Sequence, residues 1–294
     1  MNKREFLQMM GAGAVAGTAG AWMAGSMAES GTAPAESKSR NKETSYERII
    51  RRGKIRCAWA TYEPATIVDP LTRKMSGIYY EITNLVGDYL GFPVEWTEEV
   101  GWGEIIQGFK TGRYELFGSS LFPTPQRSVA ANFSTAPYFS PYYAYVRADD
   151  KRFAAYEELN KPAVRISVQD GDVNDSIVRV SFPHAKKVSL PQMVQDKQRY
   201  YDVLMNKADV AFAEPVIMET FLKAHPGTLK RITDPRPLRV FPATLMFNDD
   251  DWRLKKMFDT AMFELYNAGI VHKLIEKYTG RTDLFLMPND PYKG

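Results

Sequence analysis

The chain is poor in the residues that build disulfides and metal centres. Its 294 residues include one cysteine, Cys57, and three histidines. A single cysteine excludes a disulfide within the chain. His184, His225 and His272 lie far from one another and from Cys57 in the sequence, so the spacings typical of a zinc site or a catalytic Cys-His pair are missing. We expect no metal and no cofactor, and we expect Cys57 to be buried in a strand.

An excess of charge of one sign is also missing. Lysine and arginine number 38 against 35 aspartate and glutamate residues, which gives a net charge of +3. The basic residues form no tracts interleaved with aromatic residues, as a surface that follows a phosphate backbone requires. Nucleic acid is therefore not an expected partner. The length and the 44% hydrophobic content predict two compact units rather than one.

The N-terminus carries the features of an export signal. Lys3 and Arg4 precede a weakly apolar stretch, 6–24, that is rich in glycine and alanine. Residues 2–8 resemble the twin-arginine signature, with Lys3 in place of its first arginine. Small residues offer a cleavage site at Ser26-Met27-Ala28, and a second at Ala33-Pro34-Ala35.

We therefore predict an export signal over 1–28, leaving open whether export follows the twin-arginine or the general route. An uncleaved membrane anchor is the alternative. Because no cysteine that could carry a lipid lies near the cleavage region, we expect the mature protein to be free in the periplasm, without membrane insertion, as a monomer. Residues 29–44 are rich in serine, glycine, lysine, glutamate and proline and are predicted to be a flexible lead-in.

Strand and helix patterns alternate along the rest of the chain. Ser45 is expected to cap a short helix that Gly53 ends. The strands expected after it are 54–60, 93–97, 114–121, 163–168, 187–190, 208–213 and 239–247. The helices expected are 82–90, 102–109, 173–180, 197–205, 216–224, 254–265 and a last one that ends at Tyr278. Such alternation predicts an α/β fold with mostly parallel sheets flanked by helices.

Two lobes follow from the way this alternation stops and restarts. We assign 45–141 and 242–294 to lobe 1, and 142–241 to lobe 2. The segment after 242 has too little sheet of its own to stand alone, so it is expected to pack on lobe 1. The chain then crosses between the lobes twice, near 139–142 and near 241–244.

Several motifs in a fixed order resemble one protein family. They are Gly53-Lys54-Ile55-Arg56 with Tyr62-Glu63-Pro64, Gly101-Trp102-Gly103-Glu104, Ser119-Ser120-Leu121-Phe122-Pro123-Thr124-Pro125-Gln126-Arg127 with Phe133-Ser134-Thr135-Ala136-Pro137-Tyr138, Lys207-Ala208-Asp209, and Lys277-Tyr278-Thr279-Gly280. From about Ser45 to Gly280 the chain resembles the amino-acid-binding branch, family 3, of the type II periplasmic substrate-binding proteins of ABC importers. This resemblance implies a two-lobed fold with two hinge crossings and a ligand held between the lobes.

Arg127 is the first candidate binding residue. Thr124 followed by Pro125 predicts the start of a helix, with Arg127 in its first turn. A carboxylate at that place would gain a guanidinium partner and the positive end of the helix. The resemblance implies that Arg127 binds the α-carboxylate of the ligand. A surface arginine paired with a nearby acid is the alternative.

Glu214 is the second candidate. It follows the apolar strand 210–213, and ligands of α/β proteins bind at the carboxyl ends of strands. The resemblance implies that Glu214, in place of the family's aspartate, accepts the α-ammonium group of the ligand. The alternative is that Glu214 only caps the helix that starts at Pro215.

The resemblance also implies supporting residues from lobe 1. Ser119 and Ser120 would meet the ligand amino group, and Phe122, where the family has serine or threonine, would contribute its backbone N–H. Tyr62 and Trp102 would sandwich the ligand side chain. Trp102 also fits the apolar stripe of its own helix, so a position in the core is the alternative.

Lobe 2 contributes a loop. Gly171 lets the backbone approach a ligand closely, with the N–H groups of Asp172 and Val173 directed at the carboxylate. The carboxylate of Asp172 itself would repel that group unless it turns away or meets a cationic ligand. Gln169 is a candidate for the specificity pocket. The family's acidic partner for basic ligands is replaced around Trp59-Ala60, which implies a ligand other than lysine or arginine.

The function expected from these residues is binding of an amino acid or a related small zwitterion, followed by delivery to a membrane permease. An enzyme is the alternative, because Lys151-Arg152-Phe153 and the residues up to Ile166 look like the cyclohexadienyl (arogenate) dehydratases of the same fold. The catalytic acid of that branch comes one helical turn after the position of Glu214. Here Ile217 occupies that turn, and it cannot donate a proton. A sensor input module is a third possibility.

Overall fold

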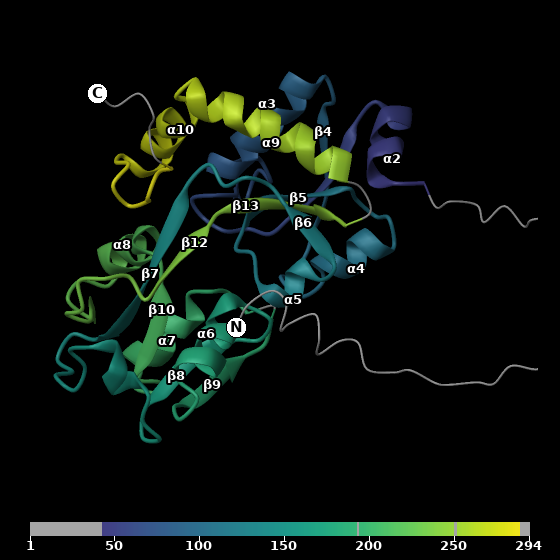
Figure 1. Cartoon of the computed structure of the whole chain (residues 1–294). Coiled ribbons are helices and arrows are strands. Elements are labelled where there is room, and N and C mark those ends of the chain that lie inside the picture. Colours follow the sequence, from purple (N-terminus) through teal and green to yellow (C-terminus); the bar gives the residue numbers. More distant parts are fainter. Residues whose placement is uncertain (1–42, 193, 250–251, 289–294) are drawn as a thin grey trace, which may run out of the picture. The chain divides into compact units, whose positions relative to one another are not determined.

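The computed structural model describes residues 43–192, 194–249 and 252–288 (Figure 1). The predicted export signal and the lead-in up to residue 42 lie outside the described residues. The last two residues of that lead-in belong to the fold. Glu43 forms an ion pair with Arg51 at 2.7 Å, and Thr44 caps the first helix, α2 (Ser45–Arg52). Glu43 and Thr44, which we assigned to the lead-in, therefore contact the helix that follows them.

The N-cap of α2 is Thr44 and not Ser45, so this detail of the prediction was wrong. The hydroxyl of Thr44 accepts a hydrogen bond from the backbone N–H of Glu47, whose carboxylate accepts one from the backbone N–H of Thr44. This reciprocal capping satisfies two helix-end donors at once, which Ser45 could not do because position 48, three residues after it, is an arginine. Gly53 ends the helix in the left-handed conformation, as predicted.

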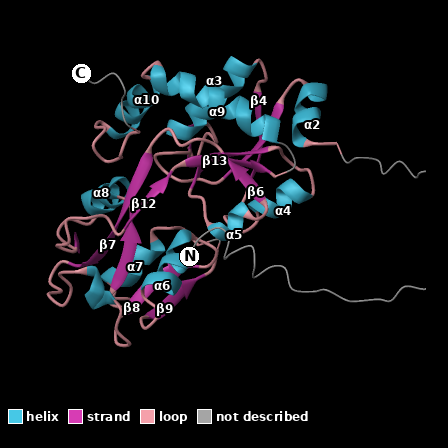
Figure 2. Ribbon diagram, viewed as in Figure 1, coloured by secondary structure: helices cyan, strands magenta, loops and turns pink. Residues whose placement is uncertain are grey.

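The first sheet has the strand order β4-β1-β5-β13-β6 (Figures 1 and 2). Its strands are β1 (Ile55–Trp59), β4 (Val94–Glu99), β5 (Leu116–Leu121), β6 (Ala131–Phe133) and β13 (Thr244–Asn248). β1 runs parallel to β4 and β5, whereas β13 runs antiparallel to β5 and β6. Every residue of β5 and β13 is buried, which explains why both read as continuous apolar or small-residue runs.

The second sheet has the order β11-β7-β10-β8-β9, with β12 paired to β7. Its strands are β7 (Phe139–Arg147), β8 (Arg165–Gln169), β9 (Lys186–Leu190), β10 (Val210–Ala213), β11 (Leu229–Arg231) and β12 (Arg239–Pro242). β8 runs parallel to β9 and β10, while β7 runs antiparallel to β10, β11 and β12. Both sheets are thus mixed and not mostly parallel, because β7 and β13 enter them in the reverse direction.

Helices cover the two sheets. They are α3 (Ile78–Leu90), α4 (Ile105–Lys110), α5 (Pro125–Ser128), α6 (Val173–Ser181), α7 (Gln198–Leu204), α8 (Pro215–Ala224), α9 (Trp252–Asn267) and α10 (Ile270–Thr279), with a short 3₁₀ turn η1 (Tyr156–Leu159) and a hairpin of β2 (Ile67–Val68) and β3 (Met75–Ser76). α9 and α10 pack against α3 beside the first sheet. The C-terminal region therefore returns to the first half of the chain, as expected.

Two strands connect the sheets. β7 and β12 pair antiparallel, with Phe139 opposite Pro242 and Tyr142 opposite Arg239, and β12 leads directly into β13 of the first sheet. These segments coincide with the two crossings expected from the sequence. We call the elements around the first sheet lobe 1 and those around the second sheet lobe 2; the residue boundaries predicted for the lobes stay a prediction.

Within the described residues, no helix combines the length and the apolar character needed to cross a membrane. The same residues contain no group of three or more histidine, cysteine, aspartate or glutamate side chains placed to hold a metal ion. Cys57 is fully buried in β1, as predicted.

Candidate functional site

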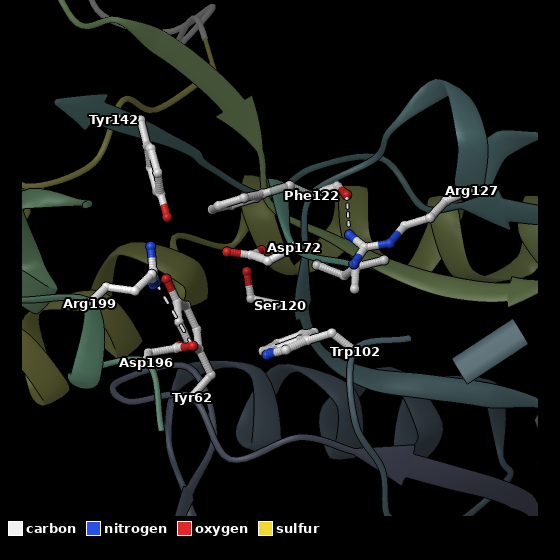
Figure 3. Close-up of a pocket in the computed structure, with 10 residues that line it drawn as sticks. Tyr62, Trp102, Ser120, Phe122, Arg127, Tyr142, Asp172, Asp196 and Arg199 are labelled. Atoms are coloured by element: carbon white, nitrogen blue, oxygen red, sulfur yellow. Dashed lines mark hydrogen bonds and ion pairs between the residues drawn. The ribbon is translucent and has the colours of Figure 1, made fainter. Parts of the chain in front are cut away.

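A small cavity of about 20 Å³ lies between the two lobes (Figure 3). Its wall is formed by Tyr62, Trp102, Ser120, Leu121, Phe122, Arg127, Tyr142, Asp172, Asp196 and Arg199. The first six come from segments of lobe 1, and the last four from β7 and the loops and helices of lobe 2. Residues that are far apart in the sequence and belong to different lobes thus line one cavity.

Arg127 is held in the wall by its own helix start. Thr124 caps α5 by accepting a hydrogen bond from the N–H of Arg127, and Pro125 is the first helical residue, both as predicted. The guanidinium group donates to the carbonyl oxygen of Phe122 at 3.0 Å and, across the cavity, to that of Gly171 at 3.3 Å. Burial lowers the pKa of Arg127, which Asp172 partly offsets. Both hydrogen-bond partners are neutral carbonyl groups, so the side chain is not a surface arginine paired with an acid.

Glu214 reaches the site through a contact between the lobes. It lies at the carboxyl end of β10, is 3% exposed, and accepts a hydrogen bond from the hydroxyl of Tyr62 in lobe 1. Its side chain makes no capping hydrogen bond to α8, although the residue occupies the N-cap position. The alternative that Glu214 serves only as a helix cap is therefore wrong.

The environment of Glu214 disfavours its charged form. Burial raises its pKa to about 7, against the lowering effect of the hydroxyl groups of Ser140 and Tyr62. Asp196 and Asp172 add a smaller upward contribution. Titratable groups that are strongly perturbed by burial and specific neighbours, and that lie beside a cleft, are typical of functional sites. Glu214 is such a group.

Aromatic rings make up much of the cavity wall. Tyr62 and Trp102 meet edge to face with ring centres 5.7 Å apart, and Trp102 also contacts Phe117 of the core. Phe122 stacks on Phe241 at 4.9 Å and lies edge-on to Tyr142. Trp102 thus belongs both to the cavity wall and to the core. The sequence analysis had treated these two positions as alternatives.

The loop before α6 differs from its expected role. Asp172 caps α6: its carboxylate accepts hydrogen bonds from the N–H of Val173 and from the side-chain amide of Asn174. The N–H of Asp172 donates to the carbonyl group of Gln169. In this structure both N–H groups that were predicted to face a ligand carboxylate are engaged within the loop. Asp172 nevertheless lines the cavity, with its oxygen atoms already hydrogen-bonded.

Ser119, Ser120 and Gln169 have different positions. Ser120 lines the cavity, whereas Ser119 is fully buried and joins β5 to the backbone of Ala60 through hydrogen bonds of 2.9 and 3.2 Å. Gln169 donates to the carbonyl groups of Gln192 and Val194 and does not line the cavity. Six of the ten predicted site residues therefore line the cavity, namely Tyr62, Trp102, Ser120, Phe122, Arg127 and Asp172. Glu214 contacts one of them, Tyr62, while Ser119, Gln169 and Val173 are buried outside the wall.

The family of the chain follows from its match to a family model. The model of the bacterial extracellular solute-binding proteins, family 3, matches residues 55–281. The chain belongs to this family. The matched range contains Arg127, Glu214 and all the residues that line the cavity, so the family resemblance inferred from the motifs is confirmed.

Curated relatives of this solute-binding protein include a transport protein and an enzyme. A probable amino-acid ABC transporter-binding protein of Haemophilus influenzae is 22% identical over 222 residues, covering 75% of this chain and 82% of the relative. A membrane-bound lytic murein transglycosylase F of Salmonella paratyphi B is 25% identical over 240 residues, which cover 75% of this chain but only 44% of the enzyme. More than half of that enzyme thus has no counterpart in the match.

The fold is shared with solved structures. The crystal structure of an ancestral amino acid-binding protein, a precursor of cyclohexadienyl dehydratase, superposes with a TM-score of 0.69 at 21% identity and covers 80% of this chain and 99% of the ancestral one. The two-lobed α/β class predicted from the sequence is therefore confirmed.

Four residues of the cavity wall were not predicted as site residues: Leu121, which lies in a motif of the family resemblance, and the three residues Tyr142, Asp196 and Arg199. Arg199 is 1% exposed, and it donates to the carbonyl oxygen of Phe212 and lies 3.8 Å from Asp196. None of the three lies in a motif of the family resemblance. The available signal was an arginine in a segment read as an amphipathic helix, three residues after an aspartate, but that spacing is common on helix surfaces.

Proposed function

We propose that this family 3 protein is the substrate-binding component of an ABC importer and that it captures an amino acid or a related small zwitterion between its lobes. The observation that carries the proposal is that Arg127 and Glu214 lie on different lobes and that each forms a hydrogen bond with a residue of the other lobe. Arg127 donates to Gly171, and Glu214 accepts from Tyr62. Arg127 lines the cavity, and Glu214 lies behind the cavity wall, where it contacts Tyr62. A guanidinium and a carboxylate beside one cavity match the two charges of an amino acid.

The contacts between the lobes have the chemistry of the proposed ligand. Carbonyl oxygens of Phe122 and Gly171 accept from Arg127, where a ligand carboxylate would accept. The hydroxyl of Tyr62 donates to Glu214, where a ligand ammonium group would donate. A ligand would exchange neutral partners for charged ones, and hydrogen bonds to charged groups contribute about 1.5–3 kcal/mol each. A few such exchanges suffice for micromolar affinity or better, after the costs of association.

The cavity is too small for an amino acid as it stands. A volume of about 20 Å³ accommodates roughly one or two water molecules. Capture therefore requires the lobes to move apart about the paired strands β7 and β12 and to close again on the ligand. The closed, ligand-bound form would then be the one that docks on a membrane permease, in line with the amino-acid transport relative. We further propose that the protein acts in the periplasm as a monomer.

Replacement of Arg127 tests the proposal directly. We expect wild-type protein to melt at a higher temperature in the presence of at least one common amino acid, because a ligand that binds only the folded state stabilises it. Arg127→Ala should weaken the binding of that amino acid about 100-fold or more, since two charge-assisted hydrogen bonds are lost. Titration calorimetry would measure this loss.

The control is Arg113→Ala, which removes an exposed arginine of lobe 1 that pairs with Glu98. It should leave the affinity unchanged. Unaltered binding by Arg127→Ala would remove Arg127 from the site. If no amino acid and no related small zwitterion shifts the melting temperature, the proposed function itself is refuted.

A dehydratase is the second candidate, favoured by one observation: a buried carboxylic acid with a pKa of about 7 at the cavity can act as a general acid. The ancestral structure with the same fold is a precursor of such an enzyme. Against it, Ile217 occupies the first turn of α8, where a proton donor was sought. Incubation of prephenate or arogenate with the protein and, in parallel, without it would decide, because an aromatic product that forms faster with the protein requires an enzyme.

A further inference from the structure

Asp196 and Arg199 form an ion pair in the cavity wall that the proposed function does not use. Asp196 precedes α7, and Arg199 lies in its first turn. Figure 3 shows the pair at the side of the cavity opposite Arg127, with Asp172 and Ser120 between them. The α-carboxylate and α-ammonium groups of an amino acid are assigned to Arg127 and Glu214. The Asp196–Arg199 pair is then left for the ligand's side chain.

Asp196 and Arg199 form no direct hydrogen bond with each other. The nearest nitrogen of Arg199 and oxygen of Asp196 are 3.8 Å apart, beyond hydrogen-bond distance. The guanidinium group donates to the carbonyl oxygen of Phe212 at 3.1 Å, and its Nε has no hydrogen-bond partner within the described part of the chain. A buried polar group left without a partner costs free energy. Arg199 therefore lines the cavity and keeps one buried donor without a partner, near an acceptor on Asp196.

The backbone of α7 and the core hold Arg199 in place. Its side chain is 2% exposed and lies over the ring of Tyr200, while Asp196 is 21% exposed. Tyr142 adds a hydroxyl group from β7, whose one contact among the described residues is a weak one of 3.5 Å from the amide of Asn174. The polar end of the cavity thus offers a donor, an acceptor and a hydroxyl group on rigid elements.

The charges of this end of the cavity balance. A second ammonium or guanidinium group on the ligand would meet Arg199, and a second carboxylate would meet Asp196. Each would therefore have one attractive and one repulsive neighbour at close range. A neutral group that accepts and donates side by side has no repulsive neighbour and can satisfy both members of the pair. Primary carboxamide and ureido groups have this arrangement of one carbonyl oxygen and one NH₂.

Asp172 also lines the cavity, between the pair and Arg127 (Figure 3), and the positive charge of Arg127 offsets its negative charge. The oxygen atoms of Asp172 also accept hydrogen bonds from Val173 and Asn174 at the start of α6. From these contacts we infer that the binding site selects amino acids whose side chain ends in a neutral amide or ureido group, with the carbonyl oxygen on Arg199 and the NH₂ group on Asp196. This inference rests on the proposed function.

Two pairs of near-isosteric ligands test the inference. Glutamine and glutamate differ by amide against carboxylate, and citrulline and arginine differ by ureido group against guanidinium. Titration calorimetry on the wild-type protein should show the neutral member of at least one pair binding about tenfold or more tightly than its charged partner. Equal or tighter binding of the charged members, or a preference for norleucine over all four, would overturn the inference and leave the proposed function standing.

A charge-neutralising variant tests the residues themselves. Asp196→Asn keeps the shape of a partly exposed side chain and leaves Arg199 without its acidic neighbour. The preference should then move toward the anionic ligand, so that the ratio of the dissociation constants of glutamate and glutamine falls about tenfold or more. The matched control is Asp175→Asn on α6, which breaks the exposed ion pair with Lys187 and should leave the ratio unchanged.

The outcomes separate the two proposals. An unchanged ratio in Asp196→Asn, with a melting temperature like that of the wild type, would remove the pair from the specificity site. If no amino acid binds the wild-type protein, the proposed function fails first and the inference fails with it. A shift of the ratio in both variants would show a general effect of charge on lobe 2 and would likewise contradict the inference.

Discussion

Glu214 combines burial with the ammonium-binding role that we propose for it. Its carboxyl group lies at the end of a fully buried strand, and its hydrogen bond comes from Tyr62 of the opposite lobe. Burial holds the pKa of Glu214 at about 7, so near neutral pH a large share of the protein carries this group protonated. Only the ionised form can pair with a ligand ammonium group.

The affinity for a zwitterionic ligand should therefore depend on pH. A carboxyl group with a pKa of about 7 is mostly ionised at pH 8 and mostly protonated at pH 6. We expect binding to weaken about tenfold from pH 8 to pH 6 and to be coupled to proton release at the lower pH. Titration calorimetry in buffers of different ionisation enthalpy would measure both effects.

Glu214→Gln is the control for this pH dependence. It retains the acceptor for Tyr62 but cannot ionise, so its affinity should be low and nearly constant between pH 8 and pH 6. The remaining acids near the site are Asp196 and Asp172. A slope in the variant as steep as in the wild type would assign the dependence to those residues instead of Glu214.

At the level of single residues, the sequence predicts which residues start a helix better than it predicts which side chains line the cavity. Thr124, Pro125 and Arg127 were placed correctly because a helix start depends on neighbouring residues. Ser119 lies in the same buried strand as Ser120, but successive residues of a strand point to opposite faces, and only Ser120 lines the cavity. Which face of β5 is turned to the cavity depends on the neighbouring strands, and the sequence of β5 alone does not reveal it.

At the level of elements, the two lobes repeat one arrangement. In lobe 1 the chain runs β1, α3, β4, α4, β5 with the sheet order β4-β1-β5, and in lobe 2 it runs β8, α6, β9, α7, β10 with the order β9-β8-β10. The cavity is lined from the ends of corresponding strands: Ser120 from β5 lies in its wall, and Glu214 follows β10. Alternation of strand and helix made this level predictable.

The repeat extends to a buried ion cluster in each lobe. Glu115, just before β5, accepts hydrogen bonds from the backbone and guanidinium group of Arg56 on β1. Asp209, just before β10, does the same with Arg165 on β8. Although burial opposes it, hydrogen bonds from Arg165 and its neighbours hold the pKa of Asp209 below its usual range. Each carboxylate ties the first strand of its lobe to the third.

Removal of the negative charge of Glu115 should lower the free energy of unfolding. Glu115 is fully buried and also accepts from Arg48 and Arg52 of α2, so Glu115→Gln leaves three guanidinium groups without their shared carboxylate. Breaking a buried ion pair from one side costs about 3–5 kcal/mol of unfolding free energy. Urea unfolding at neutral pH would measure the change.

The matched control in the same sheet is Glu95→Gln. Glu95 on β4 pairs with Lys54 at 3.0 Å, and both side chains are about half exposed, at 46% and 45%. Exposed pairs contribute about 1 kcal/mol or less. If both variants lose a similar, small amount of stability, Glu115 does not hold β1, β5 and α2 together.

At the level of the whole molecule, three side-chain hydrogen bonds or ion pairs among the described residues bridge the lobes away from the crossing strands. They are Tyr62 with Glu214, Arg127 with Gly171, and Arg281, beyond α10, with Glu219 on α8 at 3.3 Å. The sequence predicted the crossings but not these contacts, because bridging residues lie far apart in the chain and depend on how far the lobes close. In the capture cycle that we propose, these contacts would set the balance between open and closed forms in the absence of ligand.

Tyr62→Phe should shift this balance toward the open form. The substitution keeps the ring that contacts Trp102 and removes only the hydroxyl group that donates to Glu214. A hydrogen bond to a charged or partly charged group contributes about 1.5–3 kcal/mol, so the open-to-closed ratio should rise about tenfold or more. Small-angle scattering of the ligand-free variant should give a larger radius of gyration than that of the wild type.

Ligand should abolish that difference, because a saturating amino acid bridges Arg127 and Glu214 without the hydroxyl group of Tyr62. Tyr89→Phe on α3 is the control, since Tyr89 is 53% exposed and outside the cavity wall. Its radius should equal that of the wild type in both conditions. If Tyr62→Phe also matches the wild type without ligand, the Tyr62–Glu214 contact does not govern closure, and the charge pair that binds the ligand must close the lobes by itself.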